Sequence, residues 1–570
     1  MLVRDEELAE KKVFVRKATG LVREIGFITA ILIVMCNMIG LGWQKRLFQF
    51  TGPAIVPENG YFLGIPPIVM AFIIVGIIVL FTVWVFAILG AAMPRSGGGY
   101  VYISRILNPS LGFLASWTEF FSIAVSYGLI GTAVFEAILI YAKLAQVSSD
   151  IVNTLATPEV LLVGGMIIVI LFALLASMGV RMAGLLLQIM FWIPAAITVV
   201  IYGMLLAVTP QALNSGIQSF TGQTPTAFTQ LALSQGMDTP YAGGYWSAVP
   251  YAALGAYWAY IGFAASTFVA GEIKEVAKNL PRTLFIANGL VVLLYITSSA
   301  LVARAAMMVG QVTVAATGNT YSFFSAYSFM SYNSAGTLPS VLPKAWMPNI
   351  AAFIAMGNGL NWLPILVVIF AVFWVANDIP PFILTSSRIV FAMAFDRVLP
   401  EKLAEVNERW HSPIWAVIFC MLVAFIGNFA ESDVFVKWFG SGHILTRFIN
   451  SGGGVVATDI WDTIFFLLAA IAGLMFVYRR KDIYERSSYK PSLGGIPAVT
   501  IIGLIATIGN IWMLYAVVAP PSGYGITYPE VWYFTIILLV IGAIIYYYYR
   551  SKGSRTGVDY GTIYTEIPPE

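Results

Sequence analysis

The sequence predicts an all-α membrane protein with twelve transmembrane helices. Of its 570 residues, 59% are hydrophobic and only 10% are charged, whereas about 25% of the residues in an average soluble domain are charged. A hydrocarbon core of about 30 Å requires about 20 apolar residues of helix. The stretches that meet this requirement cover approximately residues 25–49, 66–92, 112–142, 159–179, 183–208, 246–272, 284–308, 362–388, 414–430, 457–478, 497–519 and 528–549.

The distribution of lysine and arginine predicts the orientation. If the tail 1–24 lies inside, 24 of the 31 basic residues fall in inner segments or tails. This excess is the positive-inside pattern, so we expect both tails, 1–24 and 550–570, in the cytoplasm of a multi-pass protein of the plasma membrane. No cleavage site of small residues follows the first apolar run, which we therefore interpret as a retained span and not as a signal peptide.

The first span contains a predicted interruption at Gly40-Leu41-Gly42. Each glycine weakens a helix by about 1 kcal/mol relative to alanine. Lipid offers no water to the backbone groups that a break exposes, so a broken helix is tolerated only where protein covers it or where it lines a cavity. Such a break in the middle of a span indicates a substrate site.

Several function classes are disfavoured by residue content. Cys36 and Cys420 lie within predicted spans and are expected to be buried thiols, without a disulfide or a metal cluster. Both histidines, His411 and His443, lie in connecting segments, which argues against intramembrane haem ligation. No metalloprotease or nucleophile-elbow motif occurs in the right context, so we expect neither an enzyme nor a nucleic-acid partner.

Four blocks of sequence occur in order along the chain. They are NMIGLGWQ from Asn37, MPRSGGGYVYISRILNPSLGF from Met93, WAYIGFAAS from Trp258 with GEIKEVAKNLPRTL from Gly271, and SSRIVFAMAFDRVLP from Ser386. Together they resemble the amino acid permeases of the amino acid–polyamine–organocation superfamily. The resemblance implies a single transporter domain of LeuT-type fold, in which residues 25–208 and 246–478 form two inverted repeats of five spans. Helices 11 and 12, within 497–549, are then peripheral.

The resemblance also implies a substrate site between broken helices 1 and 6. Amide groups at half-helix N-termini attract a carboxylate, and carbonyl groups at half-helix C-termini attract an ammonium or a sodium ion. The substrate-binding positions that follow are Ile39, Gly40, Leu41 and Gly42 in the first span, and Tyr260, Ile261 and Gly262 in the sixth. Trp258 lies where the family commonly places a gate, although a core aromatic is an equal alternative.

Three positions depart from the family pattern. Leu41 replaces a residue that is often smaller, and Ala264 lies where relatives often carry a carboxylate. The fifth span has no lysine or arginine between Met182 and Val208. We therefore do not expect the lysine-based proton mechanism of some relatives.

Other residues are candidates for coupling or gating. An acid near the bilayer centre costs about 2.5–3.5 kcal/mol on insertion scales, so it is a functional candidate. Asp378 and Asn377 precede two prolines in the eighth span, and Glu119 lies in the third. The hydroxyls of Ser386 and Ser387 either serve an ion or bond to carbonyls of their own helix.

Two other acids are expected to be structural. Glu136 and Lys143 share a helix face and are predicted to pair, and Glu272 is predicted to pair with a loop cation.

The function predicted from these observations is secondary active transport of amino acids by alternating access, as a symporter or an exchanger. The alternatives are a transporter of polyamines or organic amines, and a transporter-like solute sensor. We expect no cofactor beyond a coupling proton or sodium ion, and the assembly is left open between a monomer and a homodimer. The long connections 209–245 and 309–361 are expected to hold short surface helices or a lid.

Overall fold

The computed structural model describes residues 19–51, 61–144, 147–237, 244–333, 336–339, 342–519 and 529–567. Most of the predicted tail 550–570 is thereby included, whereas most of the predicted tail 1–24 (residues 1–18), residues 568–570 and the first residue of the predicted twelfth span lie outside the described residues. Within the described residues the fold is all-α apart from two hairpins of two-residue strands. The predicted fold class is confirmed.

Eleven helical segments in the described part of the chain are long and apolar enough to cross a membrane. Their components are α2 (Phe27–Met38) continued by η1 (Gly42–Arg46) and α3 (Leu47–Thr51), α4 (Pro67–Ala92), α6 (Pro109–Leu144), α8 (Pro158–Ser177), α9 (Val180–Leu206), α14 (Val276–Ala306), α17 (Leu363–Ala376) continued by α18 (Ile379–Phe395), α19 (Ile414–Glu431), α22 (Val455–Arg479), α24 (Ala498–Val518) and α26 (Pro529–Arg555).

The predicted sixth span is not among these eleven segments. It does not form one long helix because it is divided into α12 (Tyr245–Tyr260) and α13 (Ala265–Phe268), with a 3₁₀ turn η3 (Ala270–Glu272) after them. Its interruption is the structural reason why it lacks the length of the other spans. The chain therefore has about twelve membrane-spanning segments, as predicted.

Short elements fill the connections. The long segments after the fifth and seventh spans hold short helices and the hairpin β1–β2. The helices α10 and α11 after the fifth span are partly exposed, as one of the two predicted possibilities, whereas α15 and α16 after the seventh span are mostly buried. The short elements are α5 (Gly99–Ile106), α7 (Ser149–Leu155), α10 (Pro210–Thr221), α11 (Pro225–Ser234), β1 (Val312–Thr313), β2 (Thr320–Tyr321), α15 (Phe323–Tyr332), α16 (Met347–Gly357), η4 (Glu401–Ala404), α20 (Val434–Phe439), α21 (Ile444–Gly452), α23 (Lys481–Arg486), β3 (Ser492–Leu493), β4 (Ile496–Pro497) and α27 (Tyr560–Thr565).

The interrupted helices occupy the middle of the bundle. Helix α2 packs against α14, α9, α13 and α18, and α12 packs against α4, η1 and α22. Helix α26 is the least buried span, which agrees with its predicted peripheral place. The division into two inverted repeats stays a prediction.

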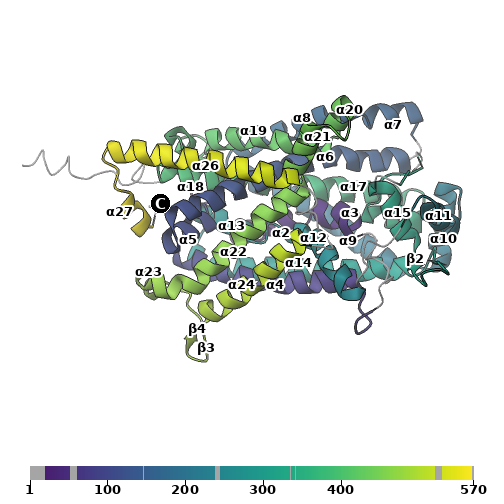
Figure 1. The fold of residues 1–570 in the computed structure, drawn as a ribbon, viewed down its shortest axis with the longest axis horizontal. Helices are drawn as coiled ribbons and strands as arrows, with labels where there is room; N and C mark the ends of the chain where they lie inside the picture. The colour runs from purple at the N-terminus through teal and green to yellow at the C-terminus, as the bar shows by residue number, and fades with distance from the viewer. Residues whose placement is uncertain are drawn as a thin grey trace, which may run out of the picture.

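The long axis of the bundle has two distinct ends (Figure 1). We call one the terminal end, because α27 lies there, and the other the loop-helix end, because it carries α10, α11 and α15. Residue Ile25 forms a β-bridge with Ile273, so the beginning of the first span is fixed to the segment that follows the sixth.

Candidate functional site

The first span breaks at the predicted glycines. Helix α2 ends at Met38, the backbone of Ile39 leaves the helical region with φ −84° and ψ 85°, and helical structure resumes as the π-helix η1 at Gly42. The hydroxyl of Tyr295, from α14, donates to the carbonyl of Met38. One of the carbonyl groups that lack a helical partner at the C-terminus of α2 is thus hydrogen-bonded by a side chain of the seventh span.

The sixth span breaks at the second predicted glycine. Helix α12 ends at Tyr260, Ile261 is extended, and Gly262 has φ +103°, a conformation that side-chain-bearing residues rarely adopt. A Cβ atom at Gly262 would overlap the backbone and side-chain oxygens of Asn37. The two breaks therefore touch each other, and glycine at position 262 permits that contact.

The eighth span has a third interruption at Asn377 and Asp378, between α17 and α18. The following residues Pro380 and Pro381 have no amide hydrogen, so they cannot donate to the carbonyls four residues earlier. The amide of Leu41 donates to Oδ2 of Asp378 at 3.2 Å. A Cβ atom at Gly40 would overlap the same carboxyl group, so glycine permits the Asp378 carboxyl to reach the break in the first span.

Several polar atoms at this centre have no hydrogen-bond partner among the described residues. They are Nδ2 of Asn37, both side-chain polar atoms of Asn377, and Oδ1 of Asp378. All three residues are almost wholly buried. Buried polar atoms are normally paired, so this centre is equipped to bind a polar ligand. An amide hydrogen suits a carboxylate, and a carboxylate with a free oxygen suits an ammonium.

The structure brings together most of the predicted substrate residues, which are Ile39, Gly40, Leu41, Gly42, Ile261 and Gly262. Gly42 packs so closely on Ala259 of α12 that a Cβ atom would overlap the Ala259 Cα. Tyr260 instead points into an aromatic group, where its hydroxyl donates to the carbonyl of Phe72 at 3.2 Å and its ring lies 5.0 Å from that of Tyr295.

Trp258 lies between the centre and the loop-helix end. It is buried, and the guanidinium of Arg46 lies 5.3 Å from its ring centroid. The indole nitrogen has no partner among the described residues. These contacts fit both predicted alternatives, and the role of Trp258 as a gate stays a prediction.

The hydroxyls of the eighth span show the alternative arrangement. Ser386 donates to the carbonyl of Phe382 at 2.8 Å, and Ser387 donates to the carbonyl of Ile383 at 2.6 Å. These hydroxyls satisfy their own helix in this conformation. Their predicted coupling role has no support from these contacts.

Glu119 belongs to a second buried group and not to the contacts described above. Its carboxyl lies against that of Asp462, and Asp459 lies within the electrostatic reach of Asp462. Both aspartates are on α22, and sequence reasoning overlooked them. The signal that was available is the pair of acids inside the apolar stretch 457–478, since intramembrane acids are functional candidates by default.

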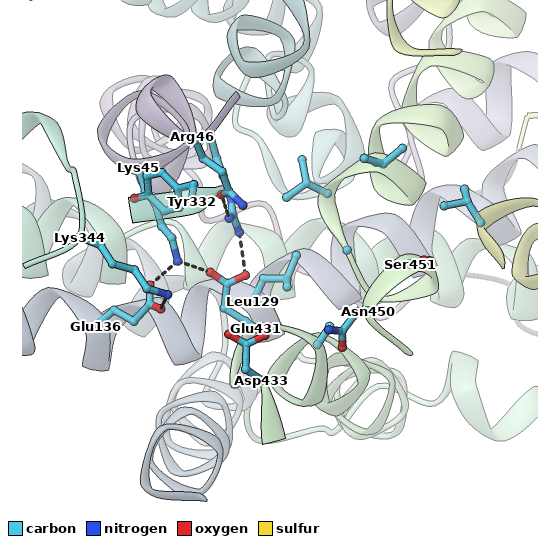
Figure 2. Close-up of a pocket in the computed structure, with 16 residues that line it drawn as sticks. Lys45, Arg46, Leu129, Glu136, Tyr332, Lys344, Glu431, Asp433, Asn450 and Ser451 are labelled. Carbon is cyan, nitrogen blue, oxygen red and sulfur yellow. Dashed lines mark hydrogen bonds and ion pairs between the residues drawn. The ribbon is translucent and has the colours of Figure 1, made fainter. Parts of the chain in front are cut away.

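A cavity of about 300 Å³ lies on the loop-helix side of Trp258. Figure 2 shows its charged wall, where Lys45 binds Glu136 and Glu431, and Arg46 binds Glu431. The Arg46–Glu431 distance is 2.9 Å. These pairs connect η1 to the end of α19 and to α6.

Two loop residues line the same cavity. The Glu136 carboxylate raises the pKa of the Lys344 ammonium, and burial raises the pKa of the Asp433 carboxyl. The predicted Glu136–Lys143 pair is wrong: Glu136 bonds to Lys45 and lies 3.5 Å from Lys344, while Lys143 donates to the carbonyl of Leu342 at 2.9 Å. Helical spacing favoured the local partner, whereas the tertiary fold delivers Lys45 from the broken first span.

The terminal end is closed by two fully buried ion pairs. Arg388 of α18 binds Glu272 through two hydrogen bonds of 2.9 and 2.8 Å, and Arg105 binds Asp396 at 2.6 Å. The prediction that Glu272 pairs with a loop cation is wrong in its partner, because the cation comes from the eighth span. Buried ion pairs therefore join separate helices at both ends of the bundle.

The amino acid permease family model matches residues 25–542. The chain belongs to the amino acid permease family. The predicted superfamily resemblance is thereby confirmed, and the broken-helix centre lies within the matched region.

Individual relatives of this permease are amino acid transporters. It is 25% identical over 405 residues to the Asc-type amino acid transporter 1 of Mus musculus, covering 70% of this chain and 64% of that protein. It is 26% identical over 400 residues to the large neutral amino acids transporter small subunit 2 of Homo sapiens, covering 70% and 63%. The branched-chain amino acid permease BcaP of Bacillus subtilis is 22% identical over 503 residues, covering 86% and 89%. The match thus spans less than two thirds of the mammalian relatives' length.

Proposed function

We propose that this permease carries amino acids across the plasma membrane by alternating access, as a symporter or an exchanger. The observation that carries the proposal is the meeting of three interrupted spans. The break in the sixth span touches the break in the first, and an amide of the first span donates to a buried carboxyl of the eighth. Both termini then face the cytoplasm, so the terminal end is the inner end. The functional unit is a monomer or a homodimer.

The geometry suggests how the centre holds a zwitterion. In the structure Oδ2 of Asp378 accepts the hydrogen bond of the Leu41 amide. A substrate carboxylate that took this amide would displace Asp378, and the displaced carboxylate would pair with the α-ammonium of the same substrate. The free polar atoms of Asn37 and Asn377 would supply further bonds. The exchange gives each charge of the substrate a partner, an amide dipole for the carboxylate and the Asp378 carboxylate for the ammonium, and buried charges need such partners.

The two locked ends support alternation. The pairs of Lys45 and Arg46 with Glu431 close the outer end, and the Arg388–Glu272 pair closes the inner end. The ion pairs at each end join a broken span, or the turn next to it, to another helix. Either end can therefore open by breaking its own ion pairs while the pairs at the other end stay intact. We propose that substrate binding favours release of one lock at a time.

The substrate class is proposed from the relatives. Their names specify large neutral and branched-chain amino acids, so leucine is the first probe. The test is a thermal-shift screen of the purified protein with leucine and with putrescine, followed by leucine counterflow in proteoliposomes. A ligand of the folded form raises the melting temperature by mass action.

We expect a melting-temperature increase with leucine, no increase with putrescine, and exchange of internal for external leucine. A response to putrescine without a response to any amino acid would contradict the proposal in favour of an organic-amine transporter. Binding without counterflow would indicate a solute sensor.

A further inference from the structure

The connection between α19 and α22 consists of two short helices, α20 and α21, that expose a group of large apolar side chains. Trp438 is 51% exposed, Phe439 46%, Ile444 54% and Leu445 47%. We call these four residues the α20–α21 patch. An exposed apolar patch of this kind marks a site that contacts a protein or a membrane.

Two other short helices of the bundle have a different surface. Helices α10 and α11 lie at the loop-helix end (Figure 1), and the large hydrophobic side chains that are most exposed among the described residues include none from these two helices. Their exposed positions carry polar side chains, such as Gln218 and Gln230. Helices that face water at this end therefore bury their apolar side chains, whereas α20 and α21 do not.

The position of the patch is fixed by the ends of three membrane spans. Lys437 of α20 binds Glu159, in the first turn of α8, at 2.6 Å. Arg447 of α21 lies 3.3 Å from Glu530, in the first turn of α26. Helix α19 ends at Glu431, just before α20 begins. Because spans begin and end where the hydrocarbon core meets water, the patch lies at the level of the membrane–water interface.

The rest of the connection is packed against protein. The ring of Phe448 lies 5.1 Å from that of Phe534 in α26, and a Cβ atom at Gly452 would overlap the Phe534 ring. The hydroxyl of Thr446 donates to the carbonyl of Phe435 at 3.0 Å, which joins α21 to α20. These contacts hold the two helices on the bundle with the patch on their exposed side.

We propose that the α20–α21 patch binds phospholipid at the membrane–water interface, and that this contact holds the ion pairs of Glu431 in place. The inference goes beyond the proposed transport function and does not require it. Amphipathic helices that lie in the interface bury their apolar face at the boundary between headgroups and acyl chains. Tryptophan is enriched at the same depth because its ring is amphipathic.

The charges of the connection agree with a phospholipid surface. Residues 434–452 contain Lys437, His443 and Arg447 but no acid, so the connection itself has no carboxylate that would repel the lipid phosphates. The two acids that it contacts, Glu159 and Glu530, are already paired with its basic side chains. Since the patch lies beside the ends of spans, the surrounding bilayer reaches it without a further protein.

The connection is continuous with the ion pairs at the loop-helix end. Ser432 and Asp433 alone separate Glu431 from α20, and Asp433 is in the left-handed conformation with φ +57°. Asn450 and Ser451 of α21 line the same 300 Å³ cavity as Glu431 (Figure 2). A shift of α20 and α21 would therefore move Glu431 and one wall of this cavity together.

The first experiment measures whether the patch contacts lipid. A nitroxide is attached to Leu445→Cys, with Cys36 and Cys420 replaced by serine, and the purified protein is placed in nanodiscs of equal parts phosphatidylcholine and phosphatidylglycerol. Oxygen concentrates in the bilayer, whereas a nickel chelate stays in water. The ratio of spin relaxation by oxygen to relaxation by nickel should be several-fold higher than at Gln218→Cys, the matched exposed position on α10. Equal ratios at the two positions would overturn the inference.

The second experiment measures whether the lipid contact supports the Glu431 ion pairs. The double variant Trp438→Gln with Leu445→Gln should speed reaction of a reporter, Leu41→Cys, with a water-soluble maleimide in the same nanodiscs. Its melting temperature in detergent should match that of the parent, because both substituted side chains are exposed. The control Ile151→Gln replaces an equally exposed residue (53%) on α7 and should leave the labelling rate unchanged.

Labelling of the double variant at the parent rate would overturn the link to the Glu431 ion pairs. A lower melting temperature in detergent would show that the two side chains stabilise the protein by packing, and it would also overturn the inference. Neither measurement uses transport, so a failure of the proposed function is distinguishable from a failure here.

Discussion

At the residue scale, the contact between Asp378 and the Leu41 amide explains why two unusual residue choices occur together. A carboxyl group inside a membrane span is costly, and a glycine weakens a helix. Here Gly40 leaves room for the carboxyl, and the carboxyl accepts an amide that the break has released. Gly40 thus makes room for the buried Asp378 carboxyl, and that carboxyl accepts a hydrogen bond from an amide that the break leaves without a helical partner.

Replacement of Asp378 by asparagine should abolish leucine uptake while the protein still inserts and folds. The amide oxygen of asparagine can still accept the Leu41 hydrogen bond, whereas the charge for the substrate ammonium is lost. Proteoliposome uptake and the melting temperature are the two measurements. Asp378→Ala is the comparison, because it also leaves a buried amide unpaired at a cost of about 1–3 kcal/mol. Normal concentrative uptake by the asparagine variant would refute the role of the charge.

Replacement of Gly262 by alanine should destabilise the protein and impair leucine binding. The residue has φ +103°, and a Cβ atom would overlap Asn37, so a strain of about 1–3 kcal/mol is expected. Gly203→Ala, in α9, is the control because nothing lies within 4 Å of the added Cβ. Thermal unfolding with and without leucine distinguishes the two variants, and equal melting curves would contradict the assigned contact.

Residue-scale prediction from the sequence was uneven for physical reasons. The breaks at Gly40, Gly42 and Gly262 follow from local backbone preference, which the sequence carries. The partners of Glu136 and Glu272 depend on which distant helices meet, and helical spacing does not encode that. Asp459 and Asp462 were missed, although the sequence shows both acids within the apolar stretch 457–478.

At the element scale, three interruptions meet at one level of the bundle, in the first, sixth and eighth spans. The short helix α13 and the 3₁₀ turn η3 continue directly into a segment bonded to Ile25, so the first and sixth spans are tied at the terminal end. The Arg388–Glu272 pair adds the eighth span to this tie. Movement at the terminal end therefore involves all three interrupted spans.

The variant Arg388→Met should lower stability strongly, because it leaves Glu272 as an uncompensated buried charge. Removal of one partner of such a pair typically costs about 3–5 kcal/mol. The double variant Arg388→Met with Glu272→Gln should recover much of that loss. Thermal unfolding of both singles and the double forms a double-mutant cycle, and strictly additive effects would contradict the pairing.

The outer lock leads to an accessibility prediction. Glu431 binds both Lys45 and Arg46, so Glu431→Gln should weaken closure above Trp258. A reporter cysteine, Leu41→Cys in a background with Cys36 and Cys420 replaced by serine, should then react faster with a membrane-impermeant maleimide added outside. Labelling as slow as in the parent would indicate that these ion pairs are not the gate.

At the scale of the whole molecule, the sequence predicted the class and the span count because both follow from apolar length. The sixth span was also predicted, because its sequence is apolar over the required length. Its helical pieces are each too short to cross a membrane alone. The cavity and the ion pairs at the two ends could not be predicted, since they depend on which separate helices meet.

The central claim is that the paired breaks bind both charges of an amino acid. The measurement that tests it most directly is competition for radiolabelled leucine on the purified protein by leucinamide and by the 2-hydroxy analogue of leucine. The first lacks the carboxylate, and the second lacks the ammonium. Hydrogen bonds to charged groups contribute about 1.5–3 kcal/mol, so each analogue should compete at least about tenfold more weakly than leucine. If either analogue competes as well as leucine does, the paired breaks do not bind both the carboxylate and the ammonium of the substrate.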